Sequence, residues 1–181
     1  MRALIYIIDA LSTLVTLVFL LRFWLPLFRV DFHNPLARGI LQITSPVVNP
    51  LRRVLPAIGR IDSATVLLAF LVQAITLILV VLLAGGTPGA RYVVFGAIFG
   101  LVSLSLRLFM FAIIIRIVLS WVAPSTHNPM TAVLVRMTEP LLQPFRRMIP
   151  PLGGLDISPV IVIILLGALS IFLEDAFTAL L

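Results

Sequence analysis

The sequence contains no cysteine, no lysine and few charged residues of any kind. Without cysteine, disulfide bonds and thiolate metal sites are excluded. Charged side chains make up 11% of the 181 residues, whereas a soluble domain carries about 25%. All thirteen basic residues are arginine, and with seven acidic residues the formal net charge is +6. So low a charge density argues against a soluble globular domain.

Hydrophobic residues make up 61% of the chain and the mean hydropathy is +1.22, which together indicate a protein that resides in a lipid bilayer. A membrane-spanning helix needs about 20 mainly apolar residues. Four stretches meet this requirement, near residues 3–28, 64–84, 97–122 and 157–177. The first has no small-residue cleavage site between Leu20 and Trp24, so we expect it to remain as a helix rather than leave as a signal peptide. The predicted fold class is all-α, a polytopic membrane protein with four transmembrane helices.

One motif occurs twice in the chain, at a spacing of 94 residues. Residues 44–56 read TSPVVNPLRRVLP and residues 138–150 read TEPLLQPFRRMIP, with three prolines and an arginine pair in the same places. The register holds without a gap from Arg22 to Asp62. Such agreement indicates an internal duplication. We therefore predict two tandem repeats, residues 1–87 and 88–181.

Each predicted repeat crosses the membrane twice, so both repeats should insert in the same orientation as parallel repeats. Ten of the thirteen arginines lie in the two long connections and their flanks, residues 22–62 and 116–156. Retained arginine marks the cytoplasmic side of an inner (plasma) membrane. Both termini and the Gly85–Gly89 turn are then predicted to face the periplasm.

Each long connection begins with an amphipathic helix, predicted over residues 35–45 and 129–139. Asn34 and Asn128 precede a proline, which is typical of a helix start. Two arrangements fit the amphipathic pattern. Our preferred one places each helix in the lipid headgroup region, and the alternative packs it as a cytoplasmic lid on the helix bundle. Pro46 is predicted to end the first of these helices.

The arginine pairs lie between prolines that should stiffen the chain. One interpretation is that these arginines set the topology and contact anionic lipid headgroups. The other is that each stiffened segment forms a docking surface for a partner membrane protein. Nucleic acid is excluded as a partner because the sequence has no recognition motif and no basic run interleaved with aromatic residues. The predicted docking residues are Arg52, Arg53, Arg146, Arg147, Pro46, Pro50, Pro140 and Pro144.

Four ionisable residues fall inside the predicted spans, away from the arginine-rich end: Asp9, Arg107, Glu174 and Asp175. A charge in hydrocarbon is costly and usually pairs or faces a polar interior. At 1.5 Å per helical residue, Arg107 and Glu174 come to about the same depth. We predict that Arg107 pairs with one of the acids. The pair either fixes the helix register or belongs to an ion pathway.

The sequence shows no pattern typical of an enzyme, such as a nucleophile elbow, a zinc-protease helix or a phosphate loop. His33 and His127 occupy equivalent places before Asn-Pro. They could share a metal, but no further ligands at suitable spacing support that, and capping residues at the interface are the favoured interpretation. We expect no cofactor and no metal.

The repeated Asn-Pro helix, followed by [Ser/Glu]-Pro-x-x-x-Pro-x-Arg-Arg-x-x-Pro and then Gly-x-x-Asp, resembles the YggT family, also called YlmG or CCB3-like in other branches. The resemblance covers nearly the whole chain, in the two-repeat form typical of proteobacteria. It implies links to cell division and envelope organisation, to assembly of membrane complexes in plastids, and to osmotic or potassium-related phenotypes. It supplies no catalytic residues. The first repeat has Ser45 where the second has Glu139.

From these observations we predict a non-enzymatic inner-membrane protein that organises or assembles membrane complexes, or that takes part in cell division. Its arginine motifs would dock lipid and a membrane-protein partner. The alternative is a small transporter or channel component in osmotic or potassium adaptation. The spans carry few polar residues, which disfavours a channel, although a homo-oligomer could build a pore at its interface.

Overall fold

A computed structural model describes residues 1–31, 33–122, 128–149 and 156–180, and within these ranges the chain forms α-helices and no β-strand. His127, Pro150 and Gly153, which belong to the predicted repeat register, lie outside the described residues. The predicted all-α class is confirmed. The helices are α1 (Arg2–Leu27), α2 (Pro35–Arg52), α3 (Ser63–Leu83), α4 (Ala90–Val122), α5 (Pro129–Met148) and α6 (Ser158–Leu180).

Four of these helices, α1, α3, α4 and α6, are long and apolar enough to cross a membrane. They match the four predicted spans, with one clear difference in α4. This helix has 33 residues and begins at Ala90, seven residues before the predicted start. It is therefore about 50 Å long, whereas the hydrocarbon core is about 30 Å thick. The helix begins at Ala90 because the glycine- and proline-containing turn ends at Gly89.

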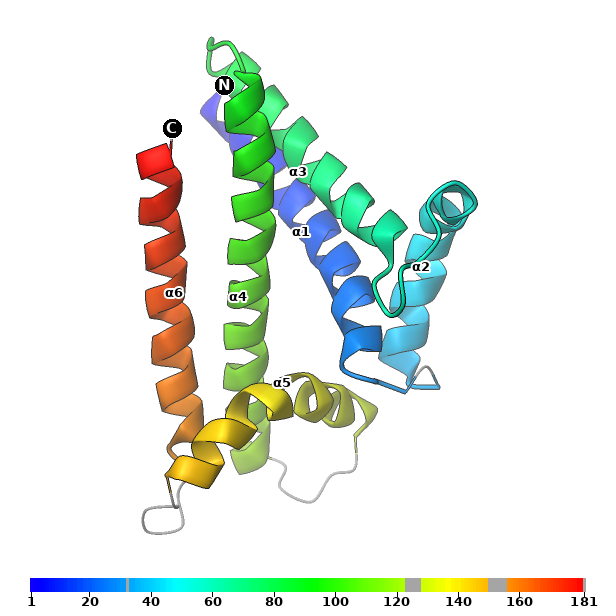
Figure 1. Cartoon of the computed structure of the whole chain (residues 1–181), viewed down its shortest axis with the longest axis vertical. Coiled ribbons are helices and arrows are strands. Elements are labelled where there is room, and N and C mark those ends of the chain that lie inside the picture. Colours follow the sequence, from blue (N-terminus) through cyan, green and yellow to red (C-terminus); the bar gives the residue numbers. More distant parts are fainter. Residues whose placement is uncertain (32, 123–127, 150–155, 181) are drawn as a thin grey trace.

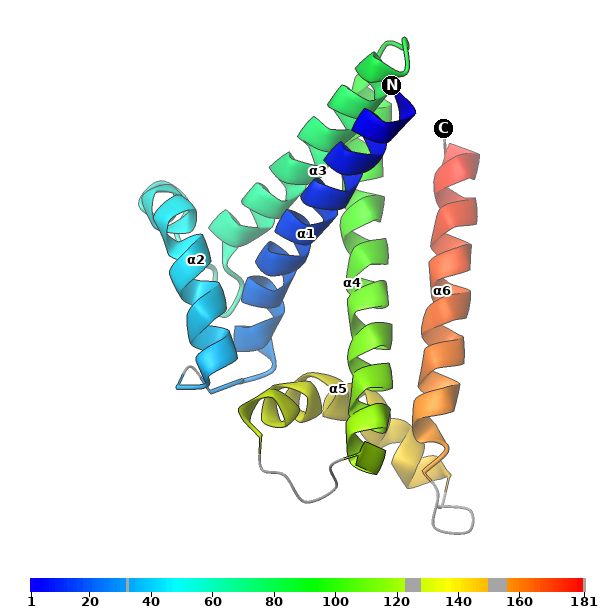
Figure 2. The same cartoon turned by 180° about the vertical axis from the view of Figure 1, so that it is seen from behind.

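The spanning helices of the two repeats run in the same directions (Figures 1 and 2). α1 and α4 lead away from the end that holds both chain termini, and α3 and α6 return to it (Figure 1). At that end α3 stops at Leu83, and Gly85 just after it has a φ of 82°, the left-handed conformation that glycine adopts easily after a helix C-terminus. The arrangement is that of two parallel hairpins, as predicted.

The two short helices start where the sequence predicts. The Asn34 side chain accepts a hydrogen bond from the Leu36 backbone N–H at 3.0 Å, and Asn128 does the same for Met130 at 3.0 Å. In each case proline occupies the first helical position, where its missing N–H is not needed. α5 lies across the ends of α4 and α6 (Figure 1).

The prediction that Pro46 ends the first short helix is wrong. α2 continues through Pro46 and Pro50 to Arg52, and α5 likewise continues through Pro140 and Pro144. All four prolines are exposed. Because they are spaced by four residues on the outer face, the carbonyls that lose an N–H partner lie on a face that water or headgroups can reach. The last turns of α2 point away from the direction of its first turns (Figure 1), which is how a helix accommodates proline.

The apolar stripe of each short helix packs largely against the spanning helices, as the lid arrangement predicts. In α2, Ile40 and Val48 are buried, whereas the apolar side chains of Ile43 and Val47 are 73% and 54% exposed. α2 therefore both covers its hairpin and keeps an apolar edge outside. The stripe of α5 is more completely buried, through Val133, Leu134, Met137 and Leu142.

Each repeat has its own small core at the equivalent place. In the first repeat Phe19 and Val48 are buried together, and in the second their counterparts Ile113 and Leu142 are buried together. These cores join a short helix to the first span of its own repeat. The duplication therefore repeats the packing as well as the sequence.

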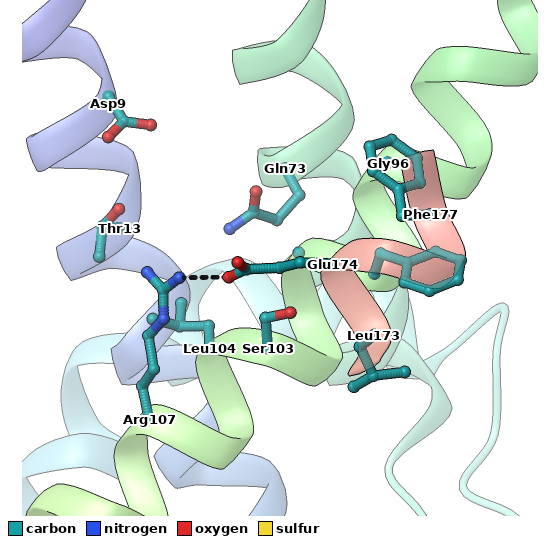
Figure 3. A pocket seen from close by; sticks show the side chains of 12 residues that line it. Asp9, Thr13, Gln73, Gly96, Ser103, Leu104, Arg107, Leu173, Glu174 and Phe177 are labelled. Carbon is teal, nitrogen blue, oxygen red and sulfur yellow. Dashed lines mark hydrogen bonds and ion pairs between the residues drawn. The ribbon is translucent and has the colours of Figure 1, made fainter. Parts of the chain in front are cut away.

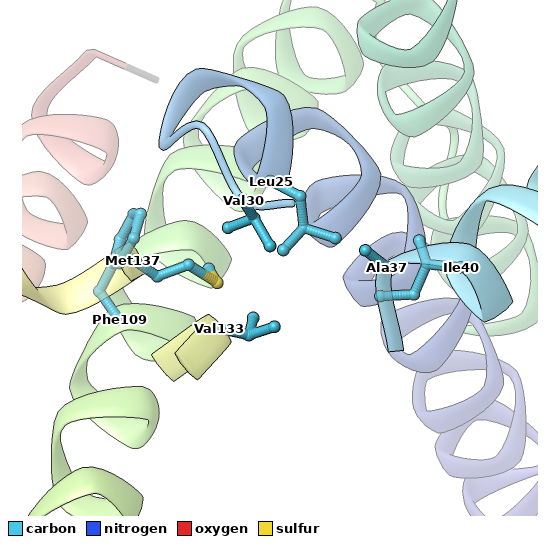
Figure 4. Close-up of a cluster of buried hydrophobic side chains, with 7 residues drawn as sticks. All are labelled: Leu25, Val30, Ala37, Ile40, Phe109, Val133 and Met137. Carbon is cyan, nitrogen blue, oxygen red and sulfur yellow. The ribbon is translucent and has the colours of Figure 1, made fainter. Parts of the chain in front are cut away.

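A third cluster, which we call the inter-repeat core, holds the two repeats together (Figure 4). The Trp24 and Phe109 rings meet edge to face with centroids 5.0 Å apart, and Phe28 meets Phe109 at 5.6 Å. The Trp24 indole N–H also donates to the Ser105 hydroxyl at 3.3 Å. The buried members of the inter-repeat core are Leu25, Val30, Ala37, Ile40, Phe109, Val133 and Met137.

Candidate functional site

The repeated arginine motif folds into a network of ion pairs in each repeat, which we call the arginine clasp. The first clasp consists of Arg22, Thr44, Arg52 and Asp62, and the second of Arg116, Thr138, Glu139, Arg146 and Asp156. Each clasp ties the end of the first span to the short helix and to the start of the second span. The repeated motif therefore stabilises the tertiary structure by joining three segments of its repeat.

In the first clasp a buried arginine and a half-exposed arginine share one carboxylate. The Arg22 side chain is 1% exposed, donates to the Thr44 hydroxyl at 2.5 Å, and has its Nε 3.7 Å from the Asp62 carboxylate. Arg52 donates twice to Asp62, at 3.1 and 2.5 Å. The Thr65 hydroxyl adds a third donor at 2.6 Å. Asp62 therefore compensates two positive charges at the N-terminus of α3.

The second clasp divides the same task between two carboxylates. Arg116 donates to Glu139 at 2.7 Å, and Arg146 donates to both Glu139 oxygens at 2.9 and 3.0 Å. Asp156 pairs with Arg146, which donates to it at 2.7 Å, and not with Arg116. Ser45, the first-repeat counterpart of Glu139, lies 3.3 Å from Arg22 as a neutral hydroxyl. The first clasp therefore depends on a single carboxylate.

The arginines hold the pKa of each clasp carboxyl below its ordinary value. At Asp62, burial favours the neutral acid, but hydrogen bonds from Arg52 and Thr65 and the charges of Arg52 and Arg22 outweigh it and lower the pKa. At Glu139, burial is likewise outweighed by the hydrogen bond and charge of Arg116 and the charge of Arg146, so its pKa is lowered too. Burial also opposes ionisation of Asp156, and its pKa falls because Arg146 and Ser158 donate hydrogen bonds to it.

We expect acid to destabilise the fold through these groups. A carboxyl with a depressed pKa contributes stability that is fully present above its unfolded pKa, about 4, and is lost as the pH falls through the lower folded value. Melting temperatures in mild detergent should stay level from about pH 7 to 5 and fall below about pH 4. A variant with Asp62, Glu139 and Asp156 all changed to the amides should show a shallower fall. Equal slopes for the two proteins would contradict the assignment.

The structure separates the predicted docking residues into two groups. Arg52 and Arg146 are engaged in the clasps. Arg53 and Arg147, the second members of the two pairs, have exposed side chains. The prolines Pro46, Pro50, Pro140 and Pro144 are also exposed. Each repeat thus has one partly exposed arginine that is held in ion pairs and a second, exposed arginine next to it.

The predicted ion pair between the spans is present. An Arg107 guanidinium nitrogen lies 3.1 Å from the Glu174 carboxylate, and both groups line a cavity of about 300 Å³ between α1, α3, α4 and α6 (Figure 3). Asp9 lines the same cavity from α1. Asp175, the fourth residue predicted for this charge cluster, is not among the described residues of its lining.

Three neutral polar residues that sequence reasoning did not assign to a site also line this cavity: Thr13, Gln73 and Ser103. The signal that could have found two of them is the repeat register. Ser103 occupies the position equivalent to Asp9, and Thr13 the position equivalent to Arg107. The cavity is therefore lined by matching polar positions of α1 and α4.

A second cavity, of about 360 Å³, lies where the starts of the two short helices meet. The Asn34 side-chain amide donates to the Pro129 carbonyl at 2.6 Å, joining the two repeats. His33, whose ring lies 2.9 Å from the Asp31 carboxylate, lines this cavity, and Asn34 supplies the helix cap. His127, the counterpart of His33 in the second repeat, lies outside the described residues. The described residues contain no cluster of three or more potential metal ligands.

Comparison with known proteins identifies relatives along almost the full chain. A profile of the CCB3/YggT family matches residues 1–83 and again residues 95–177. The second match begins 94 residues after the first, which equals the spacing of the duplicated motif. No solved structure matches the chain.

The curated relatives include bacterial and chloroplast proteins. An uncharacterized protein of Pseudomonas aeruginosa is 44% identical over 160 residues, 87% of this chain and 81% of the relative. The uncharacterized protein YggT of Escherichia coli is 32% identical over 179 residues, 99% of this chain and 93% of the relative. CCB3, a chloroplast protein of Arabidopsis thaliana whose full name refers to cofactor assembly of complex C, is 40% identical over 63 residues, 34% of this chain and 36% of the relative.

Proposed function

We propose that this chain, which belongs to the CCB3/YggT family, is a non-enzymatic organising or assembly factor of the bacterial inner membrane. It would present two surfaces to anionic lipid and to a membrane-protein partner. Each surface consists of the arginine pair and the two exposed prolines of one repeat's short helix. The name of the CCB3 relative, which refers to cofactor assembly of a complex, supports an assembly role. The arginine distribution favours periplasmic termini, with both arginine surfaces in the cytoplasm.

The single observation that carries the proposal is the paired exposure of Arg53 and Arg147. Both lie directly after an arginine that is held in a clasp, so their backbone positions are fixed by the fold. In each repeat, the short helix carries two exposed prolines before this arginine. Setting the orientation of the chain in the membrane requires positive charge on the cytoplasmic side, but it does not require the arginines to have a fixed geometry. Two exposed arginines at equivalent, fixed backbone positions suit contact with a defined surface.

The test compares two double variants that remove the same charge. Arg53→Gln with Arg147→Gln removes the outward arginines, whereas Arg52→Gln with Arg146→Gln removes the clasp arginines. An arginine near an anionic surface contributes about 1 kcal/mol, so the outward variant should lower retention of anionic lipid on the purified protein about fivefold per arginine. Native mass spectrometry measures the bound lipid.

The matched clasp variant should lose thermal stability, and the outward variant should keep it, because surface substitutions usually change stability by less than about 0.5 kcal/mol. Photo-crosslinkers placed at residues 53 and 147 should capture the same membrane protein in native membranes. Retention of lipid and crosslinks by the outward variant would refute the proposal.

The polar cavity between the repeats favours a second candidate, a small transporter. Sites near the bilayer midplane at the interface of two repeats are typical of transporters. Ion flux in liposomes separates the two candidates. The organising factor should show none above empty liposomes, whereas a flux that Arg107→Ala abolishes would establish transport.

A further inference from the structure

We infer that the cavity between α1, α3, α4 and α6 binds a small organic cation that carries one protonated amine. This inference goes beyond the proposed function and does not depend on it. It rests on where the cavity lies, on the charges that face it, and on its size and walls.

The cavity lies at the interface of the two repeats and within the spanning helices. Arg107 is 17 residues from the start of the 33-residue α4, and Gln73 is in the middle of α3, so the cavity reaches the central part of the spans. Gly100 lets α3 and α4 approach here, because a Cβ at this position would lie 3.2 Å from the Gln73 side-chain oxygen. The glycine therefore leaves room for the Gln73 amide against α4.

The charges that face the cavity sum to −1. Arg107 and Glu174 compensate each other, with 3.1 Å between guanidinium and carboxylate. Asp9 projects toward the same space from α1 (Figure 3), and no ion pair among the described residues includes it. An uncompensated carboxylate within a span is costly. One bound positive charge would neutralise the site.

The size and the walls of the cavity favour an organic cation over a bare ion. About 300 Å³ corresponds to the volume of about ten water molecules, and it lies at the lower end of the range for small-molecule sites. Leu104 and Leu173 supply apolar wall. Phe99 and Phe177 add aromatic rings to this apolar wall. An alkylammonium would place its charge near Asp9 and Glu174 and its carbon chain on this wall.

The described residues do not enclose the charged groups of the cavity. The Arg107 and Glu174 side chains are 64% and 58% exposed although they sit among spanning helices. Thr13 and Ser103 add hydroxyl groups from equivalent positions of α1 and α4. The hydroxyls can accept hydrogen bonds from an ammonium, which carries three donors.

Calorimetry with the full chain in lipid nanodiscs tests the inference. The probes are n-butylammonium, n-butanol as a neutral molecule of similar length, and potassium as a bare ion, with empty nanodiscs to subtract partition into lipid. We expect saturable binding of n-butylammonium, weaker by about tenfold or more in Asp9→Asn, because a hydrogen bond to a charged group is lost. Asp9→Glu should restore most of the affinity.

Asp175→Asn is the matched control, since it removes an acid on α6 that does not line the cavity, and it should bind as the unaltered chain does. Three results with the unaltered chain would overturn the inference whether or not the variants fold. These are no saturable binding of n-butylammonium, equal binding of n-butanol, and competition by potassium at equal concentration. Full affinity in folded Asp9→Asn would overturn it as well.

Discussion

Replacing Asp62 with asparagine is expected to lower the free energy of unfolding by about 3–5 kcal/mol, the usual cost of leaving one member of a buried ion pair unpaired. The Arg22 side chain is 1% exposed, and its Nε makes no hydrogen bond. Asp62 is the carboxylate paired with it, at 3.7 Å. The amide would keep the shape of the side chain but leave the Arg22 charge buried without compensation. Denaturation by increasing sodium dodecyl sulfate in mixed micelles measures the change.

The second repeat contains the matched control. Asp156→Asn alters the equivalent residue, but Asp156 is 38% exposed, and its partner Arg146 also pairs with Glu139. Exposed pairs contribute little, so this change should cost about 1 kcal/mol or less. Equal losses for the two substitutions would show that burial of Arg22 is not the cause.

The difference between the clasps also predicts a rescue. Ser45 lies 3.3 Å from Arg22, at the position where Glu139 pairs with Arg116 in the other repeat. Adding Ser45→Glu to Asp62→Asn should therefore return at least half of the lost stability, because it supplies a carboxylate to the same buried arginine. In the unaltered background Ser45→Glu should change stability much less. A double-mutant cycle measures this coupling directly. Additive effects would contradict it.

Replacing Phe109 with alanine is expected to cost about 3–5 kcal/mol, the usual range for a buried phenylalanine. Phe109 is 5% exposed and lies in the inter-repeat core. It belongs to α4, yet its ring packs on Trp24 and Phe28 of the first repeat. Removing it would leave a cavity between the repeats. The loss should therefore weaken the contact between the two hairpins more than either hairpin itself.

The matched control for this prediction is Phe111→Ala, two residues further along the same helix. Its side chain is 63% exposed and should face lipid, so its loss should change stability little. Crosslinking between α1 and α4 through cysteines introduced into this cysteine-free chain would report the contact between repeats. Full crosslinking in Phe109→Ala, with unchanged denaturation, would contradict the role of the inter-repeat core.

The two repeats share their helices but differ in their surroundings. Met137 of α5 is 2% exposed in the inter-repeat core, whereas its counterpart Ile43 of α2 is 73% exposed. The reason is that α5 contacts α1 of the other repeat, and α2 has no equivalent contact with α4 among the described residues. The duplicated sequence thus produces two hairpins with the same helices, but equivalent residues of their short helices differ in burial.

The sequence by itself determined the number of spans, the direction of the two hairpins relative to each other and the start of each short helix. Apolar runs of about 20 residues predict helices wherever they occur, since a helix satisfies all its backbone hydrogen bonds within one segment in lipid. Two crossings per repeat require a parallel arrangement. The Asn34-Pro35 and Asn128-Pro129 pairs mark helix starts because capping is a local interaction. These properties depend on neighbours in the chain or on composition.

Only the tertiary structure decided the roles of individual residues within these patterns. Arg52 and Arg53 are adjacent and chemically identical, but Asp62 at the start of another helix pairs with Arg52, whereas Arg53 is exposed outside the clasp. α2 continues through its two prolines because both fall on the exposed face of the helix. The charges of Asp9, Arg107 and Glu174 meet in one cavity because three helices bring them together. Ion pairing and burial depend on distances between segments far apart in the chain, which local sequence does not specify.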